Sequence, residues 1–235
     1  MANLVGYDLD GRIATITLDD GKVNALSIPM LTEVHAALDR AAQDDAVVLL
    51  TGREGMFSAG FDLPTFASGI EPTIEMLRLG ATLAERILAF PTPVVVAVNG
   101  HAIAAGSFPA LAADARIGAD GAFRIGLNEV RIGLTVPWFA IELARQRLHP
   151  AQFDRAVVNA TMYDPPGAVA AGFLDAVVAP EDLHAAAFAA ANDLAGLNPA
   201  AHAATKLRVR DGALRALRAA IESELTVEGL GGTPG

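Results

Sequence analysis

The sequence predicts an α/β fold in which helices alternate with the strands of a mostly parallel sheet. Three patterns predict it: alternating apolar residues at the start of the chain, helical spacing after them, and two short apolar runs typical of buried strands. Strands that alternate with helices favour parallel pairing. The chain has 235 residues and no internal repeat, low-complexity linker or charge block, so we expect one large domain, or a core domain with a small appendage.

The first predicted element is a β-hairpin. Residues 4–9 and 12–18 alternate apolar with polar side chains, as half-buried strands do. Asp10 and Gly11 lie between the two runs and are residues that tight turns favour. We therefore expect two antiparallel strands at the start of the chain.

A helix is predicted after Ser27, because Pro29 suits a first helical turn and apolar residues then recur at helical spacing. The apolar run at residues 47–50 is predicted to be the next strand. A second helix is predicted at about residues 73–89. The β-branched run at residues 94–98 follows it and is expected to be a strand buried on both faces.

From Trp138 onward the chain is rich in alanine, and we predict it to be helical. One strand-like interruption is expected at residues 173–178, and residues 229–235 are expected to fray. We interpret the chain as a core of residues 1–180 followed by a helical region of residues 181–235.

The composition narrows the class of function. A net charge of −10 disfavours binding to nucleic acid or to anionic membrane surfaces, and the longest apolar stretch, residues 102–113, is too short to span a membrane. The start of the chain lacks the features of a signal peptide and there is no cysteine, so we expect a cytoplasmic protein. Hydrophobic residues make up 52% and charged residues 19%, which indicates that other subunits cover apolar surface.

A turn at residues 57–63 places small residues around Gly60, after the predicted strand at residues 47–50. A ligand can approach the backbone closely at such a turn, because glycine has no side chain. An ordinary surface turn explains the same pattern. The sequence by itself leaves both interpretations open.

A second turn follows the strand at residues 94–98 and leads into an apolar helix. Pro109 must lie in the first turn of that helix, which places the helix start near Ala105 and Gly106. Free N–H groups and the positive end of the helix dipole then point either at a developing oxyanion or at water or a loop.

Four motifs in this order resemble those of the enoyl-CoA hydratase/isomerase (crotonase) family. They are Asn24-Ala25-Leu26-Ser27, Phe57-Ser58-Ala59-Gly60-Phe61-Asp62-Leu63, the segment from Pro93 to Gly100 with the following Gly106, and Gly126-Leu127-Asn128-Glu129-Val130. The resemblance runs from residue 24 to at least residue 178. It implies a crotonase-like spiral of β-β-α units, with a helical C-terminal region that builds homotrimers, often paired into hexamers.

The resemblance implies that the substrate is an acyl-CoA thioester, with coenzyme A as part of the substrate, no other cofactor and no metal. It assigns the oxyanion hole to the backbone N–H groups of Phe61 and Ala105. The residues that it implies for substrate and coenzyme A binding are Asn24, Ala25, Leu26, Ser58, Ala59, Gly60, Asp62, Leu63, Gly106 and Phe108. Lys206, Arg208 and Arg210 of a neighbouring subunit are candidates for the coenzyme A phosphates, although a solvated helix face is the simpler interpretation of each.

Hydratases of this family have two glutamates, whereas this chain has Phe108 at the first position and Glu129 at the second. Hydration normally shares its proton transfers between two carboxylates, but one base is enough to move a double bond from the 3,4 to the 2,3 position. The resemblance therefore favours a Δ3,Δ2-enoyl-CoA isomerase of fatty-acid metabolism with Glu129 as its acid/base. We expect Phe108, Leu127 and, as a further candidate, Trp138 to line an apolar cleft that raises the pKa of Glu129.

Two alternatives stay open. One is an enoyl-CoA hydratase that works with Glu129 alone or with a further acid, such as Glu71 or Glu75. The other is a non-catalytic acyl-CoA binding protein. Ser107 does not lie in a Gly-x-Ser-x-Gly motif, and a structural hydrogen bond is the simpler interpretation of His101.

Overall fold

The computed structural model describes residues 3–231 of the chain. The strands are β1 Val5–Asp10, β2 Ile13–Leu18, β3 Ala25–Leu26, β4 Val47–Thr51, β5 Gly55–Ser58, β6 Gly60–Phe61, β7 Val94–Val98, β8 Gly100–Ile103, β9 Ala115–Ala119, β10 Ile125–Gly126 and β11 Ala176–Val178. The helices are α1 Ile28–Gln43, α2 Leu63–Ala67, α3 Ile70–Ala89, α4 Phe108–Ala112, α5 Trp138–Arg145, α6 Pro150–Val157, α7 Pro165–Ala171, α8 Leu183–Ala195, α9 Pro199–Glu224 and α10 Val227–Gly231. Short 3₁₀ turns are η1 Ala104–Ser107, η2 Val130–Ile132 and η3 Pro180–Asp182.

Among the described residues the largest sheet has six strands, in the order β1-β2-β4-β7-β9-β11. Only the first pair, β1 with β2, is antiparallel, and the other pairs run parallel. The predicted hairpin and the predicted mostly parallel sheet are therefore confirmed. No helix within residues 3–231 is long and apolar enough to cross a membrane.

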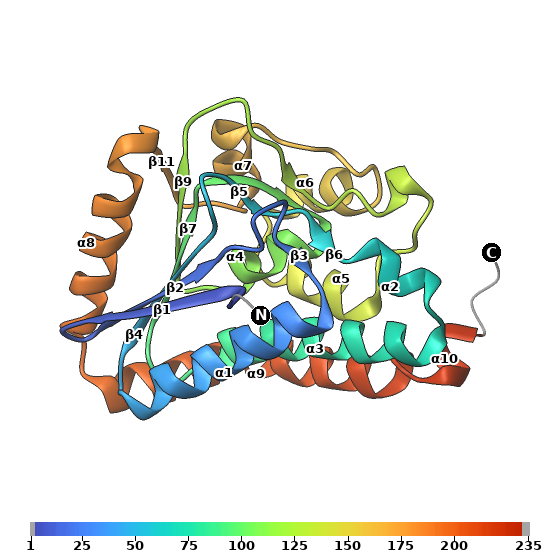
Figure 1. Cartoon of the computed structure of the whole chain (residues 1–235), viewed down its shortest axis with the longest axis horizontal. Helices are drawn as coiled ribbons and strands as arrows, with labels where there is room; N and C mark the ends of the chain where they lie inside the picture. Colours follow the sequence, from blue (N-terminus) through green and yellow to red (C-terminus); the bar gives the residue numbers. More distant parts are fainter. Residues whose placement is uncertain (1–2, 232–235) are drawn as a thin grey trace.

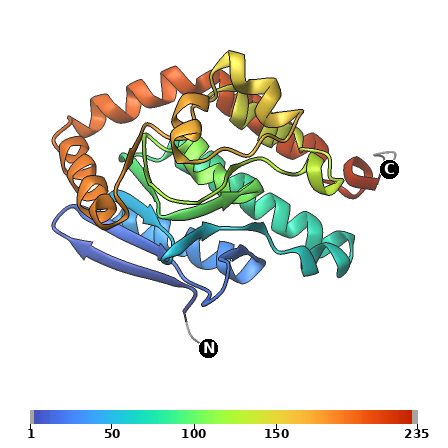
Figure 2. The same cartoon turned by 90° about the horizontal axis from the view of Figure 1, so that it is seen from above.

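Helices cover the large sheet on both faces. Along β7, Val94, Val96 and Val98 pack into the core cluster that contains buried residues of α1 and α3, whereas Val95 and Ala97 pack against the side of α8. All five residues are buried, so the prediction for residues 94–98 is confirmed. Figures 1 and 2 show α8 along one side of the sheet, at the end of the molecule away from the C-terminus.

The chain builds a spiral from repeated strand pairs. In each of the pairs β4 and β5, β7 and β8, and β9 and β10, the first strand lies in the large sheet and the second lies in a three-stranded sheet of order β10-β8-β5. A helical segment follows each pair before the chain returns to the large sheet. This is the spiral of β-β-α units that the sequence predicted.

Several boundaries differ from the predicted ones. Helix α3 begins at Ile70 rather than near residue 73, since Pro72 is tolerated in a first turn, where its missing N–H has no partner. Strand β11 covers only the end of the predicted 173–178 segment, because Phe173 N–H still donates to Ala168 O of the preceding helix. Residues 229–231 are helical in α10 rather than frayed, and residues 232–235 lie outside the described residues.

Strand β9 was not predicted, because its sequence Ala-Arg-Ile-Gly-Ala lacks the β-branched run of β7. The arginine in this strand, Arg116, is buried and forms an ion pair with Asp175. A charged side chain inside a buried strand is therefore satisfied by a residue distant in sequence.

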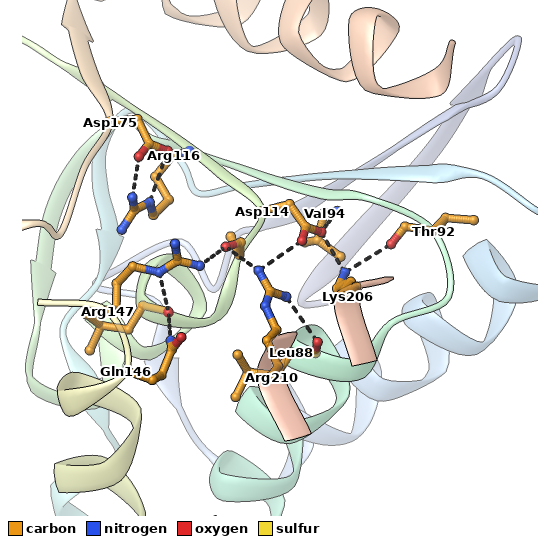
Figure 3. A network of polar contacts seen from close by, with 12 residues as sticks. Leu88, Thr92, Val94, Asp114, Arg116, Gln146, Arg147, Asp175, Lys206 and Arg210 are labelled. Carbon is orange, nitrogen blue, oxygen red and sulfur yellow. Dashed lines mark hydrogen bonds and ion pairs between the residues drawn. The ribbon is translucent and has the colours of Figure 1, made fainter. Parts of the chain in front are cut away.

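Helix α9 is attached to the core by buried ion pairs with Asp114 (Figure 3). Lys206 Nζ lies 2.6 Å from Asp114 Oδ2, and Arg210 Nη2 lies 2.9 Å from Asp114 Oδ1. Val94 N–H also donates to Asp114 Oδ2, at 2.7 Å. The Lys206 side chain is buried, so neither phosphate binding nor a solvated helix face describes Lys206 or Arg210, whereas Arg208 is exposed.

Candidate active site

The two proposed oxyanion donors lie on segments that meet at Gly60. Asp62 N–H donates to Leu26 O of β3 at 3.4 Å, and N–H groups alternate in direction along a strand, so the N–H of Phe61 points away from β3. Ala105 is the second residue of η1, where a backbone N–H has no partner within the turn. A Cβ placed on Gly60 would lie 3.3 Å from Ala105 N, so both N–H groups belong to one small region of backbone.

Glycines make this approach of the two segments possible. Gly60 has φ +93°, and a Cβ there would lie 2.8 Å from Ile103 O. A Cβ on Gly106 would lie 2.3 Å from Ser58 O. Both distances are too short for a side chain, so glycine is required at these positions by contact with backbone and, at Gly60, also by conformation.

The segment that carries Ala105 starts as a 3₁₀ turn rather than as an α-helix. Pro109 has no N–H to donate to the carbonyl four residues earlier, and Phe108 N–H donates to Ala105 O instead. The α-helical part therefore begins at Phe108, not near Ala105 and Gly106 as expected, and Pro109 lies in its first turn. Because α4 is only five residues long, the local N–H groups matter more here than a helix dipole.

Ala104, the residue before this donor, lies in the left-handed region with φ +51°. Residues other than glycine rarely adopt this conformation, and it carries a cost of about 1–3 kcal/mol. Ala104 also lines the cavity described next. The strain therefore lies beside the predicted oxyanion hole.

A cavity of about 660 Å³ opens beside these two segments, a size suited to a small-molecule ligand. It is lined by Ala59, Phe61, Leu63, Phe66, Ala67, Gly69, Ile70, Thr73, Leu77, Ala104, Phe108, Asn128, Glu129, Ile132, Gly133, Leu134, Thr135, Pro137, Glu224 and Leu230. Of these residues, two are ionisable, Glu129 and Glu224, and both are acids. The rest of the wall is largely apolar.

Glu129 is the buried acid of the cavity. It lies directly before η2, its side chain is 7% exposed, and its Oε2 has no hydrogen-bond partner among the described residues. Burial raises the pKa of Glu129 to about 7, in the direction expected from an apolar cleft. A carboxylate with this pKa is suited to take up and return a proton near neutral pH.

Phe108 is the residue that the resemblance places where hydratases have their first glutamate. Its ring is 2% exposed and makes edge-to-face contacts with Phe61 and Phe139, with centroid distances of 6.1 Å and 5.6 Å. The prediction that Leu127 and Trp138 line the cleft together with Phe108 was wrong. Leu127 is fully buried in the core and Trp138 is 60% exposed, and neither side chain lines the cavity.

The predicted binding residues divide into two groups. Ala59, Phe61, Leu63 and Phe108 line the cavity. The others are not among its lining residues, and they are Asn24, Ala25, Leu26, Ser58, Gly60, Asp62, Ala105 and Gly106. Gly60, Ala105 and Gly106 instead belong to the backbone of the two segments that meet beside it.

Several residues of the second group hold the turns in place. The amide of the fully buried Asn24 donates to Leu18 O at 2.8 Å and to Phe57 O at 3.1 Å. Ser58 Oγ donates to Asn24 O at 2.7 Å, which ties the two predicted motifs together. Asp62 caps α2 by accepting from Thr65 N–H. The Asn24 N–H also donates to Asp20 Oδ1 at 2.9 Å, so both the side chain and the backbone of Asn24 are committed to holding the turns in place.

The two acids proposed as further partners in hydration lie outside the cavity wall. Glu71 and Glu75 line an open groove on the outer side of α3 and do not line the cavity. Glu224, which sequence analysis missed, lines it instead from the C-terminal end of α9. It accepts a hydrogen bond from Trp138 N–H at 2.7 Å. No local pattern marks Glu224, because only the packing of α9 brings it there.

The two remaining candidates have structural roles. Ser107 is fully buried, and its Oγ donates to Ala104 O at 2.8 Å, within the turn. His101 Nδ1 accepts from Arg124 N–H at 3.1 Å, and its ring contacts Phe123 edge to face. Neither residue lines the cavity.

Comparison with known sequences identifies the family of this chain. Residues 8–229 match the family described as enoyl-CoA hydratase/isomerase. A protein of Mycobacterium tuberculosis named probable enoyl-CoA hydratase EchA17 is 30% identical over 205 residues, which cover 86% of this chain and 78% of the relative. Human mitochondrial enoyl-CoA delta isomerase 1 is 29% identical over 218 residues, which cover 88% of this chain and 70% of the relative.

Solved structures give the same result. An enoyl-CoA hydratase/isomerase family protein of Pseudomonas syringae is 51% identical with a TM-score of 0.93, covering 94% of this chain and 96% of that one. An enoyl-CoA isomerase of M. tuberculosis is 44% identical with a TM-score of 0.91, covering 95% and 98%. The human mitochondrial Δ3-Δ2-enoyl-CoA isomerase is 25% identical with a TM-score of 0.86, covering 97% and 93%.

Proposed function

Because this chain belongs to the enoyl-CoA hydratase/isomerase family, we propose that it is a Δ3,Δ2-enoyl-CoA isomerase that uses Glu129 as its single acid/base. One observation supports the proposal: the cavity wall contains the buried Glu129 and the apolar Phe108. By the resemblance, Phe108 takes the place of the first of the two glutamates of the hydratases. An aromatic ring cannot hold or deprotonate a water molecule. It can pack against the acyl chain of an enoyl substrate.

The reaction then needs one proton carrier and one oxyanion site. The Glu129 carboxylate removes a proton from C2 of a 3-enoyl thioester, and the electron pair moves onto the thioester oxygen to give a dienolate. The N–H groups of Phe61 and Ala105 stabilise this oxyanion. The carboxylic acid of Glu129 returns the proton to C4, so the double bond moves from C3–C4 to C2–C3 and Glu129 regains its charge.

The names of the relatives support the family but are divided on the reaction. One M. tuberculosis structure, 44% identical, is named an isomerase, whereas other structures at 42–45% identity and relatives at 30–34% identity are named enoyl-CoA hydratases. A hydratase is therefore the second candidate, and it is favoured by Glu224, a second carboxylate in the same cavity. A non-catalytic acyl-CoA binding protein is the candidate of another class.

The test is to give the purified protein trans-3-hexenoyl-CoA and crotonyl-CoA in separate reactions and to identify the products by mass spectrometry and ultraviolet absorbance. We expect 2-hexenoyl-CoA from the first substrate and little 3-hydroxybutanoyl-CoA from the second. Hydration of crotonyl-CoA without migration of the double bond would reject the isomerase. Tight binding of both substrates with no turnover would indicate the binding protein.

We further propose that coenzyme A lies along the turns at residues 24–26 and 58–63 in a cytoplasmic homotrimer or dimer of trimers. Apolar side chains exposed on this chain, among them Trp138 and Val209, are suited to burial between subunits. Light scattering of the purified protein measures the number of subunits directly.

Gly106→Ala is expected to damage the oxyanion hole. The added methyl group would lie 2.3 Å from Ser58 O, which is backbone, so the two segments must separate and misplace the donor at Ala105. We expect kcat for hexenoyl-CoA to fall about 10²–10³-fold, the usual effect of losing one oxyanion donor. Steady-state kinetics measures it.

Gly212→Ala on α9 is the matched control, because a Cβ there meets nothing within 4 Å. In a helix interior this change is expected to leave activity unaltered and to stabilise the protein slightly. Equal activity of the two variants would contradict the assigned oxyanion hole.

A further inference from the structure

Glu224 introduces a charge into an otherwise apolar part of the cavity. It is the last residue of α9, and its side chain is half-buried. The walls nearby in the fold come from α2 and the first turns of α3, which supply Leu63, Phe66 and Ile70, and from Leu134 before α5. Apolar walls of this kind suit an alkyl chain.

Glu224 reaches the cavity from a different element than Phe61 and Phe108 do. Figure 1 shows the end of α9 and α10 beside the start of α3, at the C-terminal end of the molecule, whereas β6 and α4 lie nearer its middle. Phe61 and Phe108 come from β6 and α4, and Glu224 comes from the end of α9. Glu224 therefore lies on the side of the cavity formed with α3 and α10, whereas Phe61 and Phe108 come from elements nearer the middle of the molecule.

The carboxylate of Glu224 has few partners. Oε2 accepts from Trp138 N–H at 2.7 Å, and no Lys, Arg or His is among the described residues that line the cavity. Burial raises the pKa of Glu224, and the hydrogen bond from Trp138 N–H offsets this only in part. Water must therefore solvate the rest of the carboxylate when the cavity is open.

We propose that Glu224 is a specificity-determining residue that limits the acyl group to short chains. This inference rests on the proposed function, since it takes an acyl-CoA as the ligand of the cavity. A short tail ends before it reaches Glu224 and leaves its water in place. A longer alkyl tail displaces that water and leaves a carboxylate against apolar groups, which is strongly unfavourable.

The test measures binding rather than turnover, so that it is independent of the reaction. Dissociation constants of butanoyl-CoA and dodecanoyl-CoA are determined by calorimetry for the wild type, Glu224→Gln and Glu224→Met. Gln keeps the size of the side chain and an acceptor for Trp138 N–H, and Met keeps the size alone. Both variants are expected to bind dodecanoyl-CoA about tenfold more tightly, with the constant for butanoyl-CoA changed less than twofold.

Glu222→Gln and Glu222→Met are the matched controls, because Glu222 is exposed on the same helix and does not line the cavity. They are expected to bind both ligands as the wild type does. An unchanged ratio of the two constants in Glu224→Gln, with the fold intact by circular dichroism, would overturn the inference alone. Failure of the wild type to bind either acyl-CoA would overturn the proposed function as well.

Kinetics separate this role from a chemical one. If Glu224 is an acid in the reaction, Glu224→Gln lowers kcat for substrates of every chain length. If it limits chain length, kcat for hexenoyl-CoA stays near that of the wild type and only the dependence on chain length changes. A uniform loss of kcat would therefore reject the inference and identify Glu224 as a second acid in the reaction.

Discussion

Glu129→Gln is expected to lower kcat for trans-3-hexenoyl-CoA by about 10²–10⁴-fold, because an amide cannot carry the proton from C2 to C4. The change keeps the size of the side chain and leaves the backbone donors at Phe61 and Ala105 untouched. Binding of a saturated acyl-CoA is therefore expected to stay within a few-fold of the wild type. Stopped-flow or steady-state absorbance gives the rate, and calorimetry gives the affinity. A variant that keeps wild-type kcat would show that another group transfers the proton.

The same carboxyl group sets the pH dependence of the reaction. The pKa of Glu129 is raised to about 7 by burial, and the reaction starts from the deprotonated form. In the wild type, kcat/KM is therefore expected to rise with pH, with an inflection near 7, and to level off above it. A profile that stays flat between pH 5.5 and about 8.5 would contradict the assignment of Glu129 as the base.

The stability of Glu129→Gln provides a check on folding. The sign of the change in its free energy of unfolding follows from the pKa of Glu129. The folded protein holds the proton more tightly than the unfolded chain, so the carboxyl group reduces stability progressively as pH rises from its ordinary pKa toward about 7. Above that pH, glutamine removes a buried charge, and the variant is expected to be more stable than the wild type by up to about 3 kcal/mol. Loss of activity together with unchanged or higher stability identifies a chemical role.

Asp114→Ala is expected to reduce the free energy of unfolding by about 3–5 kcal/mol, because it leaves the buried charges of Lys206 and Arg210 without their carboxylate. Burial already lowers the pKa of Lys206 to about 8 even with Asp114 present. Figure 3 shows Asp114 between these two side chains, where α9 meets the core. Urea denaturation at fixed protein concentration measures the change.

Asp211→Ala is the control on the same helix. Asp211 pairs with Arg215 at 2.8 Å, but both side chains are exposed, at 55% and 72%. Such surface pairs contribute between 0 and about 1 kcal/mol, so this variant is expected to unfold almost as the wild type does. Similar losses in the two variants would mean that burial of the Asp114 network does not hold α9 in place.

Much of the core could be predicted because its signals are local. Asp10 and Gly11 predicted the first hairpin, and Ser27 marked the start of α1, where its Oγ accepts from Met30 N–H. The glycines of the two turns were also readable, since close approach of backbone requires residues without side chains. The hairpin, the helix start and the glycine turns depend on a residue and its close neighbours. The pairing of Phe108 with Glu129 followed instead from the order of the family motifs.

The remaining features depend on which surfaces meet in the tertiary structure. The basic residues of α9 gave a pattern that fits a solvated or phosphate-binding face, but docking against the core buries Lys206 and Arg210 on Asp114, about 90 residues away in sequence. Strand β9 could not be predicted for the same reason, because the buried Arg116 is satisfied there by Asp175 and by Gly172 O, both distant in sequence.

The composition of the active-site cavity shows the same division. The sequence by itself determined the family, the spiral of strand pairs, the glycine turns and the glutamate beside Phe108. Only the tertiary structure excluded Leu127 and Trp138 from the cavity wall and placed Glu224 in it. The physical reason is that motifs report local backbone geometry, whereas burial and the cavity wall depend on how helices distant in sequence pack together.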